Sequence, residues 1–283
     1  MSKTALVLQG GGLRGVYTSG VLDILIENGI EFDAVYGISA GAKNSQYYIS
    51  KQPGEAIKVD LFCIKDKRAI SLKNFILDGG YISQKFYNEY IMTEYAPLNL
   101  EVFNSSKQKF YMGATNCLTG EIKYFEKSTD NVRDAVTASC SLPLVQSMKY
   151  INNIPYLDGG IAESISVRQA IEDGYDKILV VLTRERGYRA ENISHYLKRL
   201  LQVRYRKYPK LVEKLVTQND RHNVLLSKIE ELEQEGKIYC IYPSEPPTIK
   251  VLEKDEEKIK NLYALGRSDM TNHLKELQEY IEK

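Results

Sequence analysis

The order of apolar runs, glycines and helix-compatible segments predicts an α/β protein. Residues 4–8 form a short, continuously apolar run with a glycine close behind it, as is typical of a buried strand. A glycine-rich stretch follows at residues 10–15, and residues 16–27 then place apolar side chains at nearly helical spacing. Asn28-Gly29 supplies the helix stop. A strand, a glycine loop and a helix in direct succession favour an α/β unit.

A second unit of this kind follows, and its turn contains a serine. The apolar run 34–36 leads into Gly37-Ile38-Ser39-Ala40-Gly41, and residues 42–50 are compatible with a helix. A serine between two glycines at a strand-to-helix turn is the pattern of a nucleophile elbow. Such a turn is so tight that Gly37 and Gly41 must lack side chains, and it pushes the Ser39 hydroxyl outward. The alternative is an ordinary corner between a strand and a helix.

The middle of the chain continues the α/β pattern. Residues 51–104 are predicted to be helical with loops, with a turn at Asp78-Gly79-Gly80. Strands are expected at 109–114 and 121–125, followed by a helix over 131–139 that Asp130 would cap. Residues 176–182 are the clearest buried strand of the chain.

The C-terminal hundred residues are predicted to be mostly helical. Residues 211–234 have the pattern of one or two amphipathic helices, and residues 237–242 that of a late strand. Residues 253–283 predict a charged helical tail, which we expect to break into two helices near Gly266. Because no low-complexity linker precedes this part, we expect it to pack on the rest of the protein.

Composition and charge narrow the class of protein. The chain of 283 residues is 43% hydrophobic and 27% charged with a net charge of +1, as in soluble globular proteins, so no overall field points to nucleic acid. The four cysteines are widely spaced, which suggests reduced structural thiols. The first apolar run is too short for a signal-peptide core, and no run approaches the ~18 residues of a membrane span. These features predict a cytoplasmic protein.

The glycine loop has two functional interpretations. Gly10, Gly12 and Gly15 fit the G-x-G-x-x-G fingerprint of dinucleotide-binding proteins, but that site needs an acid at the end of the next strand. Here the acids Glu31 and Asp33 precede that strand. Alternatively, the consecutive glycines direct backbone N–H groups towards one point and form an oxyanion hole. A tight turn without a ligand is the third interpretation.

A second candidate motif is Asp158-Gly159-Gly160, which follows a short apolar stretch. The pattern suits a plain Asp-Gly turn, which local sequence favours, or a catalytic base at the edge of a pocket. A serine nucleophile needs such a base. The order Ser39, Asp158, His195 would also match an α/β-hydrolase triad, but His195 lies in a polar stretch that opens a basic helix, where a solvent-facing or capping role is favoured.

Together, three motifs in this order resemble the patatin-like phospholipase family: Gly10-Gly11-Gly12-Leu13-Arg14-Gly15, Gly37-Ile38-Ser39-Ala40-Gly41 and Asp158-Gly159-Gly160. The resemblance covers residues 4 to 183, and the remainder is similar to the C-terminal extension of a bacterial subgroup. It implies a three-layer α/β/α sandwich with a mainly parallel central sheet. The expected organisation is a catalytic domain, 1–183, and a largely helical extension, 184–283.

The resemblance also implies a reaction and roles for the motif residues. Ser39 would be the nucleophile and Asp158 its partner in a Ser-Asp dyad, and the backbone of the Gly10-Gly11-Gly12 loop would form the oxyanion hole, shaped by Arg14. The substrate would be a fatty acyl ester of a phospholipid, lysophospholipid or neutral lipid, and no cofactor or metal is expected. The 139–143 block, which contributes to the acyl channel in the family, has a polar Ser141 where a small apolar residue is common.

The segment 184–214 adds a prediction about partners. It holds ten basic residues against three acids, with tyrosines interleaved. Such a segment suits an anionic lipid surface, and would place the protein at the inner membrane face, or it is a solvated helix face. Nucleic acid is not expected, because no recognition motif accompanies the charge. Two other functions stay open: a dinucleotide-binding protein that uses the glycine loop, and a non-catalytic lipid-binding protein.

Overall fold

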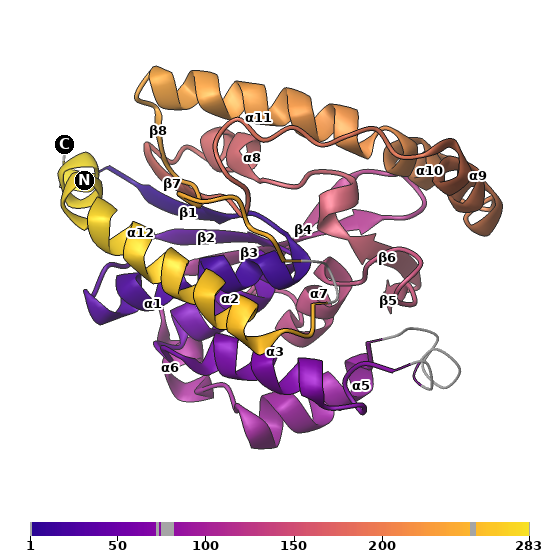
Figure 1. Ribbon diagram of the computed structural model, residues 1–283, viewed down its shortest axis with the longest axis horizontal. Helices are drawn as coiled ribbons and strands as arrows, with labels where there is room; N and C mark the ends of the chain where they lie inside the picture. Colours follow the sequence, from indigo (N-terminus) through magenta and orange to yellow (C-terminus); the bar gives the residue numbers. More distant parts are fainter. Residues whose placement is uncertain (1, 72–73, 75–81, 250–252, 283) are drawn as a thin grey trace.

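The computed structural model describes residues 2–71, 74, 82–249 and 253–282, and the turn expected at Asp78-Gly79-Gly80 lies outside these ranges. Its centre is a sheet of eight described strands in the order β5-β6-β3-β2-β1-β7-β8, with β4 also paired to β3 (Figure 1). The strands are β1 (Thr4–Leu8), β2 (Ala34–Ile38), β3 (Lys109–Asn116), β4 (Ile122–Glu126), β5 (Lys149–Ile151), β6 (Ile154–Asp158), β7 (Lys177–Val181) and β8 (Ile238–Ile241).

The central part of the sheet is parallel. β1 pairs in parallel with β2 and β7, β2 with β3, and β7 with β8, whereas β4, β5 and β6 form antiparallel pairs at one side. The carboxyl ends of the parallel strands therefore lie along one edge of the sheet, which is where ligands bind in open α/β folds.

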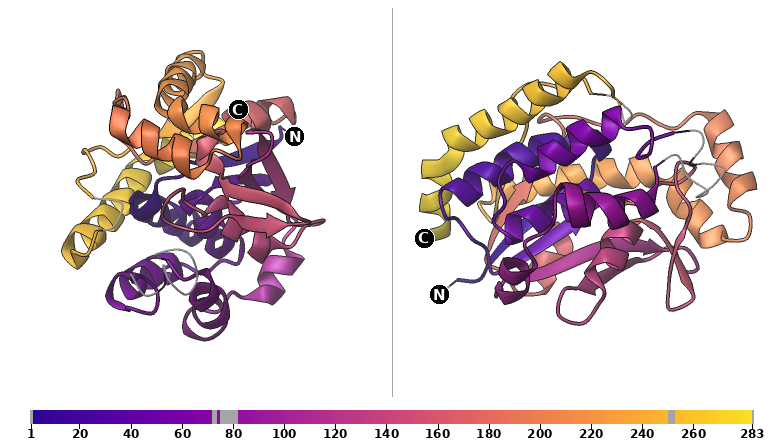
Figure 2. Two further views of the ribbon diagram at one scale, coloured as in Figure 1. Left: turned by 90° about the vertical axis from the view of Figure 1, so that its right-hand side faces the viewer. Right: turned by 90° about the horizontal axis from the view of Figure 1, so that it is seen from below.

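Helices cover both faces of the sheet. One face carries α1 (Gly15–Glu27) and α2 (Ala40–Ile49), and α12 (Glu256–Glu282) lies beside α1. The other face carries α8 (Val167–Glu172) and α11 (Gln218–Gln234) (Figures 1 and 2). Further helices are α3 (Glu55–Lys65), α5 (Gln84–Phe86), the π-helical segment η2 (Tyr87–Tyr95), α6 (Leu100–Ser105), α7 (Val132–Ser139), α9 (His195–Arg204) and α10 (Pro209–Val216).

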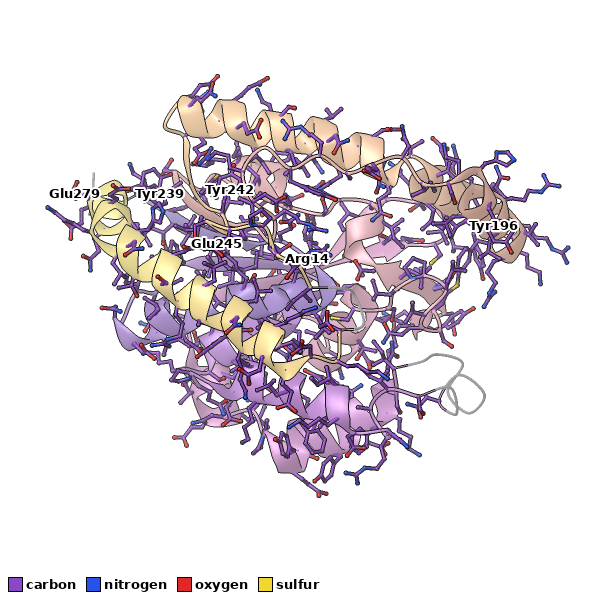
Figure 3. All side chains as sticks on the ribbon, viewed as in Figure 1. Arg14, Tyr196, Tyr239, Tyr242, Glu245 and Glu279 are labelled. Carbon is purple, nitrogen blue, oxygen red and sulfur yellow. The ribbon has the colours of Figure 1, made fainter. Side chains whose placement is uncertain are left out.

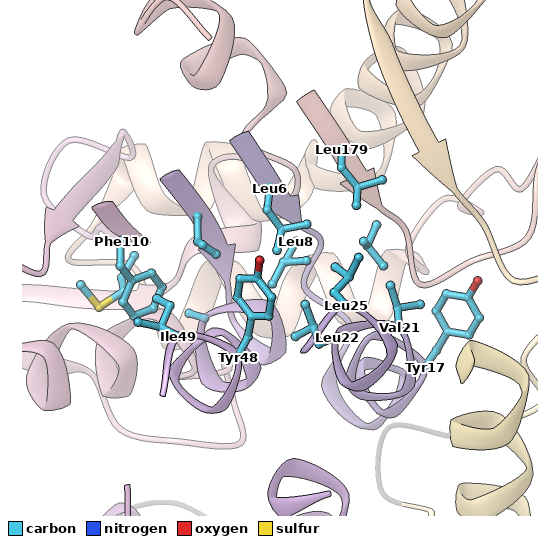
Figure 4. Close-up of a cluster of buried hydrophobic side chains, with 14 of the residues drawn as sticks. Leu6, Leu8, Tyr17, Val21, Leu22, Leu25, Tyr48, Ile49, Phe110 and Leu179 are labelled. Carbon is cyan, nitrogen blue, oxygen red and sulfur yellow. The ribbon is translucent and has the colours of Figure 1, made fainter. Parts of the chain in front are cut away.

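The alternating side chains of β1 explain the three layers. Leu6 and Leu8 pack into one buried cluster with residues of α1 and α2, as Figure 4 shows. Ala5 and Val7 point the opposite way, into a cluster that includes Ile229 of α11. Because both faces of the strand are buried, its sequence is continuously apolar rather than alternating. The predicted three-layer α/β/α sandwich with a mainly parallel sheet is confirmed.

Residues beyond 183 contribute directly to this sandwich. β8 pairs with β7 within the main sheet, and α12 crosses α1 closely enough that a Cβ on Gly266 would lie 2.1 Å from the Tyr17 carbonyl oxygen. Side-chain contacts reinforce the crossing: the Tyr17 hydroxyl donates to Asp269, and Arg267 forms two hydrogen bonds with Glu27. The predicted late strand and helical extension are present, while a domain boundary at residue 183 stays a prediction.

Two local predictions were wrong. The expected break near Gly266 does not occur, because α12 runs without interruption from Glu256 to Glu282 and the glycine serves the close contact with α1. The N-cap of α7 is Asn131, whose side chain accepts a hydrogen bond from the Asp134 amide. Asp130 instead accepts from the Glu126 amide and so stabilises the preceding turn.

Candidate active site

Ser39 occupies a strained turn between β2 and α2. Its φ of 53° and ψ of −121° place a non-glycine residue in a region that side chains rarely adopt. A Cβ on Gly37 would lie 2.5 Å from the Cα of Ala42, and one on Gly41 would lie 2.5 Å from the Leu8 carbonyl oxygen. Both flanking positions therefore exclude a side chain, which is the geometry expected of a nucleophile elbow.

The elbow is held by the segment that ends α7. The Ser39 amide donates a 2.8 Å hydrogen bond to the Ser139 hydroxyl, and the Cys140 thiol donates to the Ser39 carbonyl oxygen at 3.2 Å. Ser139 is fully buried, so its hydroxyl oxygen is a fixed acceptor. The sequence pattern of the 139–143 block suggested a part of the acyl channel and did not indicate this positioning role.

The glycine loop lies directly against Ser39. A Cβ on Gly10 would lie 3.1 Å from the Ser39 Cβ, and one on Gly15 would lie 2.5 Å from the Cβ of Ala40. The N-termini of α1 and α2 are thus neighbours beside the serine, and both favour negative charge there. Gly12 has a φ of 57°, and the amides of Gly10 and Gly11 have no hydrogen-bond partner in the described part of the chain. They are free to stabilise an oxyanion.

The glycine loop is tied to the end of β7 by two polar side chains. The Gln9 side chain accepts a 2.7 Å hydrogen bond from the Thr183 amide, and the Thr183 hydroxyl donates to the Gly10 carbonyl oxygen at 3.2 Å. A Cβ on Gly11 would lie only 2.7 Å from the Thr183 hydroxyl oxygen. Neither Gln9 nor Thr183 belongs to one of the three sequence motifs, which are residues 10–15, 37–41 and 158–160.

Asp158 reaches the same place from β6. The strand pairs with β3, which lies between β6 and the serine-bearing β2. A Cβ on Gly159 would lie 2.2 Å from the Gly113 carbonyl oxygen, so the turn needs a glycine there. The Gly160 amide donates to Asp158 Oδ1 at 2.8 Å, and the Thr115 hydroxyl donates to the Asp158 carbonyl oxygen at 2.7 Å. The carboxylate is therefore fixed in orientation.

The environment of Asp158 makes it a stronger base than an ordinary aspartate. Burial raises the pKa of Asp158 from 3.8 to about 6, while the Ser39 hydroxyl and the Gly160 amide act in the opposite direction because they favour the charged form. Oδ2 is buried and has no partner of ordinary hydrogen-bond geometry among the described residues. This oxygen can accept a proton.

Two pockets meet at Ser39. The first is mainly apolar, and its walls include Val59, Ile64 and Val136. The second, here called the polar pocket, is more polar than the first and also contains Asp158, Gly10 and Gly11, together with Arg14, Arg184 and His222. An ester held at Ser39 could thus extend its acyl chain into one pocket and its alcohol portion into the other.

The three histidines lie apart from the Ser39–Asp158 pair or form other contacts. His195 is the exposed first residue of α9, and Ser194 caps that helix. His222 lies in the polar pocket, where its Nδ1 is 2.7 Å from the Ser164 hydroxyl. Burial and the nearby positive charge of Arg14 lower the pKa of His222 to about 4, so it is neutral at pH 7. His273 contacts the Tyr239 hydroxyl.

The acid required for dinucleotide binding is at the wrong edge of the sheet. Asp33 accepts a 2.7 Å hydrogen bond from the Thr4 amide, at the start of β1, whereas the glycine loop follows the end of β1. A carboxylate at that position cannot bind the ribose of a nucleotide whose phosphates rest on the loop.

Comparison with known proteins supplies the family. A model of the patatin-like phospholipase family matches residues 6–171, and a model of a domain of unknown function (DUF6363) matches residues 208–282. An uncharacterized protein of Escherichia coli (strain K12), YjjU, is 33% identical over 187 residues, which are 64% of this chain and 52% of the relative. The chain therefore spans about half the length of this curated relative.

Among solved structures, VipD from Legionella pneumophila is similar with a TM-score of 0.43 and 12% identity, over 96% of this chain and 67% of that one. A likeness at this level carries no argument about function. The family model, however, covers more than half of the chain and includes all three motifs. This protein belongs to the patatin-like phospholipase family.

Proposed function

We propose that this protein is a serine hydrolase that cleaves fatty acyl esters of phospholipids, lysophospholipids or related lipids through a Ser39–Asp158 dyad. The observation that carries the proposal is the buried Asp158 carboxylate, whose unpartnered Oδ2 and raised pKa suit a base beside the strained Ser39 turn. Family membership supports a lipid ester as the substrate. The catalytic unit is assigned to residues 1–183 and the extension to residues 184–283.

In the first half-reaction, Asp158 accepts the Ser39 proton as Oγ attacks the ester carbonyl carbon. The amides of Gly10, Gly11 and Gly12 donate to the developing oxyanion, an effect of about 3–4 kcal/mol for each well-placed donor. Arg14 and Gly15 support this loop, since Gly15 begins α1 and Arg14 ends the short helix η1 (Gly12–Arg14) before it. When the tetrahedral intermediate collapses, Asp158 returns the proton to the leaving alcohol.

In the second half-reaction, a water molecule replaces the alcohol. Asp158 accepts one proton from this water while the water oxygen attacks the carbonyl carbon of the acyl-Ser39 ester. The proton passes back to the Ser39 oxygen when the fatty acid leaves. Each proton removed by Asp158 is thus returned, and the dyad is regenerated. The chain's own residues therefore supply the nucleophile, the base and the oxyanion donors.

Hydrolysis of a p-nitrophenyl acyl ester tests this proposal. Ser39→Ala and Asp158→Asn are each expected to reduce kcat/KM by roughly 10³-fold or more, because either change removes a member of one catalytic unit. Matched controls are Ser50→Ala, a buried serine at the far end of α2, and Asp220→Asn, an exposed aspartate of α11. Full activity in Ser39→Ala or Asp158→Asn would contradict the dyad, and saturable NAD binding without hydrolysis would favour the dinucleotide alternative.

For the membrane contact, we assign the docking surface to α9. Tyr196, Leu200 and Val203 are 80%, 43% and 60% exposed and share one face of this helix. Figure 3 labels Tyr196 at the outer end of the molecule, on α9. Arg199 on α9, and Arg206 and Lys207 in the turn that follows this helix, are exposed, and none has an ion pair in the described part of the chain. Exposed apolar residues with basic neighbours suit an anionic lipid surface.

Four other basic residues of the 184–214 segment, Arg186, Arg189, Lys210 and Lys214, are already paired with glutamates. Arg186 and Arg189 each form two hydrogen bonds with a glutamate of α11, Glu233 and Glu230 respectively. Among the described residues, no helix is both long and apolar enough to cross a bilayer. We therefore propose peripheral rather than integral contact, with a cytoplasmic location at the inner membrane face.

Flotation with liposomes tests the docking surface. Binding to anionic vesicles is expected to weaken in high salt and to be lost in Val203→Asp, because this change places a charge in the apolar stripe. Val224→Asp on α11, where the valine is 72% exposed, is the matched control and should bind as the unmodified protein does. Binding that does not depend on salt concentration, or that Val203→Asp leaves unchanged, would show that α9 is not the docking surface.

A further inference from the structure

The turn that carries Asp158 is held by side chains of α11. Asp158 is the N-cap of η3 (Gly159–Ile161), a short 3₁₀ helix that follows β6, and its side chain accepts a hydrogen bond from the Gly160 amide. A helix this short cannot satisfy most of its own carbonyl oxygens. The carbonyl oxygens of Gly160, Ile161 and Ala162 accept hydrogen bonds from α11 instead. The placement of the carboxylate therefore depends on an element much further along the chain.

Arg221 supplies the larger part of this support. Its guanidinium donates from Nη1 to the Ala162 carbonyl oxygen at 2.6 Å and from Nη2 to the Ile161 carbonyl oxygen at 2.5 Å. Nη2 also donates to the Lys214 carbonyl oxygen at 2.7 Å, so that Arg221 joins the turn to α10. Because the N–H donors of a guanidinium form a rigid, planar fork, the carbonyl groups that it binds are fixed relative to one another.

The surroundings of Arg221 favour this structural contact over a contact with substrate. In the described part of the chain, its hydrogen bonds go to carbonyl and hydroxyl oxygens rather than to a carboxylate. Burial lowers the pKa of Arg221, and the more distant charges of Glu121 and Glu213 act in the opposite direction. Arg221 lines neither of the two pockets that meet at Ser39. An effect of this residue on hydrolysis would therefore have to pass through the turn.

Gln218 holds the same turn at a second point. Its Nε2 donates to the Gly160 carbonyl oxygen at 2.8 Å. Gly160 is thus bound on both sides, because its amide donates to Asp158 and its carbonyl oxygen accepts from α11. Gln218 also lines the polar pocket, so its replacement could change substrate binding as well. Arg221 is therefore the residue that tests the support most clearly.

Apolar side chains of α10 pack against the turn from the same direction. Leu157 and Ile161 lie on either side of Asp158 in the sequence and belong to one buried cluster with Leu211 and Leu215. Both of these leucines are in α10, the helix that precedes α11. Polar contacts from α11 and apolar contacts from α10 thus converge on the turn, and both helices belong to the extension.

We propose that Arg221 and Gln218 are positioning residues for Asp158, so that the extension completes the active site of the hydrolase. The proposal rests on the function proposed above and adds residues beyond 183 to its machinery. Neither side chain takes a proton. Together they keep the Asp158 carboxylate within hydrogen-bond reach of the Ser39 hydroxyl, as a general base requires. A displacement of about 1 Å at such a base can cost about 100-fold in rate.

Steady-state hydrolysis of a p-nitrophenyl acyl ester by Arg221→Ala is the first test. We expect kcat to fall by about 10- to 100-fold and KM to change by less than about threefold, because Arg221 acts on the base and not on the substrate. Arg221→Lys should recover part of kcat, and added guanidinium ion should partly restore Arg221→Ala. Arg186→Ala is the matched control, because Arg186 binds Glu233 at the other end of α11, and it should keep full activity.

The pH profile separates positioning from a general loss of stability. The Gly160 amide opposes the effect of burial on the pKa of Asp158, because it binds the charged carboxylate. If Arg221→Ala releases the turn, this bond weakens and the midpoint of kcat/KM should move above 6. Full kcat or an unchanged midpoint in Arg221→Ala would overturn the proposal, and so would an equal loss of kcat in Arg186→Ala. If Arg221→Ala does not fold, Arg221→Lys gives the same test, because one ammonium cannot reproduce the paired donors.

Amide hydrogen exchange distinguishes failure of this support from failure of the proposed hydrolysis. In Arg221→Ala, peptides that cover residues 159–163 should exchange faster than in the unmodified protein, whereas peptides of α12 should not. Faster exchange confined to this turn, in a protein that hydrolyses no ester, would support the contact and refute the hydrolase. Unchanged exchange, in a protein that hydrolyses the ester, would refute the contact and leave the Ser39–Asp158 dyad in place.

Discussion

At the scale of single residues, the protein keeps one carboxylate in an environment that opposes its charge. Asp158 is buried at the end of β6, where its pKa is about 6, and the Gly160 amide fixes its orientation. A base with a pKa near neutrality balances two needs, because it is ionised at physiological pH and still accepts a proton readily. Two testable consequences follow from this value, one for catalysis and one for stability.

The pH dependence of hydrolysis should report Asp158. As the base must be ionised, kcat/KM is expected to rise with pH through a midpoint near 6 and to level off above it. Stopped assays over pH 4.5–8.5 with a substrate whose own charge is constant would measure the midpoint. A rise in kcat/KM centred near pH 4, or no dependence of kcat/KM on pH, would show that a different group controls the reaction.

The same burial should make Asp158→Asn more stable than the unmodified protein at neutral pH. Because the folded-state pKa lies about two units above the ordinary value of 3.8, the folded protein binds more protons than the unfolded chain between these values. The charged carboxylate therefore lowers the free energy of unfolding above pH 6, by up to about 3 kcal/mol.

Urea denaturation at pH 7.5 and pH 4 would measure this difference. Asp158→Asn is expected to gain stability at pH 7.5, and most of the gain should be lost by pH 4, where the folded carboxyl is protonated and the unfolded one is partly protonated. A variant that is less stable at pH 7.5 would mean that the carboxylate forms net favourable interactions in the folded protein. The exposed Asp220→Asn on α11 provides the control for a change of charge alone.

At the residue scale, the sequence pattern indicated the short local motifs but not the distant residues that contact them. Gly37 and Gly41 could be assigned because a tight turn has a short, local pattern, and the structure shows why each lacks a side chain. Ser139 could not be assigned as the acceptor for the Ser39 amide, since the two residues are 100 positions apart. The polar pocket was missed for the same reason, because Arg184 meets Arg14 only after the sheet has formed.

At the scale of elements, the elbow depends on a helix that carries none of the motifs. The C-terminal end of α7 supplies Ser139, which accepts the Ser39 amide hydrogen in a fully buried position. Ser139→Ala is expected to destabilise the protein by about 1–3 kcal/mol, because it leaves a buried donor unsatisfied. It should also lower kcat, since the strained Ser39 conformation loses a support.

Denaturation and steady-state kinetics on one preparation would test this role of α7. Cys140→Ala is the matched variant, and it should have the smaller effect because a thiol is a weak donor and the Ser39 carbonyl also accepts from Lys43. If Ser139→Ala keeps full stability and kcat, the hydrogen bond seen at 2.8 Å does not support the elbow.

The boundaries of helices and strands show which features could be predicted from the local sequence pattern alone. The parallel strands were predicted well, because parallel strands with helices on both faces must be continuously apolar, whereas the antiparallel β6 was not predicted as a strand. The N-cap of α7 was predicted one residue early, since Asp130 and Asn131 are both good caps and only the path of the preceding turn decides between them. Gly266 was misread as a helix break because its reason for being glycine lies in another helix.

At the scale of the whole molecule, the two ends of the chain form one structure. α12 lies along α1, as Figure 2 shows, and Gly266 and Gly20 allow the two backbones to approach closely. α1 begins at the glycine loop, so the C-terminal helix supports the element that would position the proposed oxyanion donors. The sequence predicted that the extension would pack on the remainder, but it could not indicate this particular contact.

Gly266→Ala tests the crossing. A Cβ there would lie 2.1 Å from the Tyr17 carbonyl oxygen, so the helices must separate, and we expect a loss of about 1–3 kcal/mol in unfolding free energy. Ser268→Ala, at an exposed position of the same helix, should change stability by no more than about 0.5 kcal/mol. Equal stability of the two variants would show that α12 tolerates displacement from α1.

The central claim is that Ser39 is a nucleophile activated by Asp158, and the rate of covalent labelling by a fluorophosphonate tests it most directly. Peptide mapping by mass spectrometry should locate the label on Ser39 in the unmodified protein, with no label in Ser39→Ala. In Asp158→Asn, labelling should be slower by roughly 10³-fold or more, because the hydroxyl has lost its base. A label on any other residue, or unchanged labelling of Ser39 in Asp158→Asn, would contradict the account.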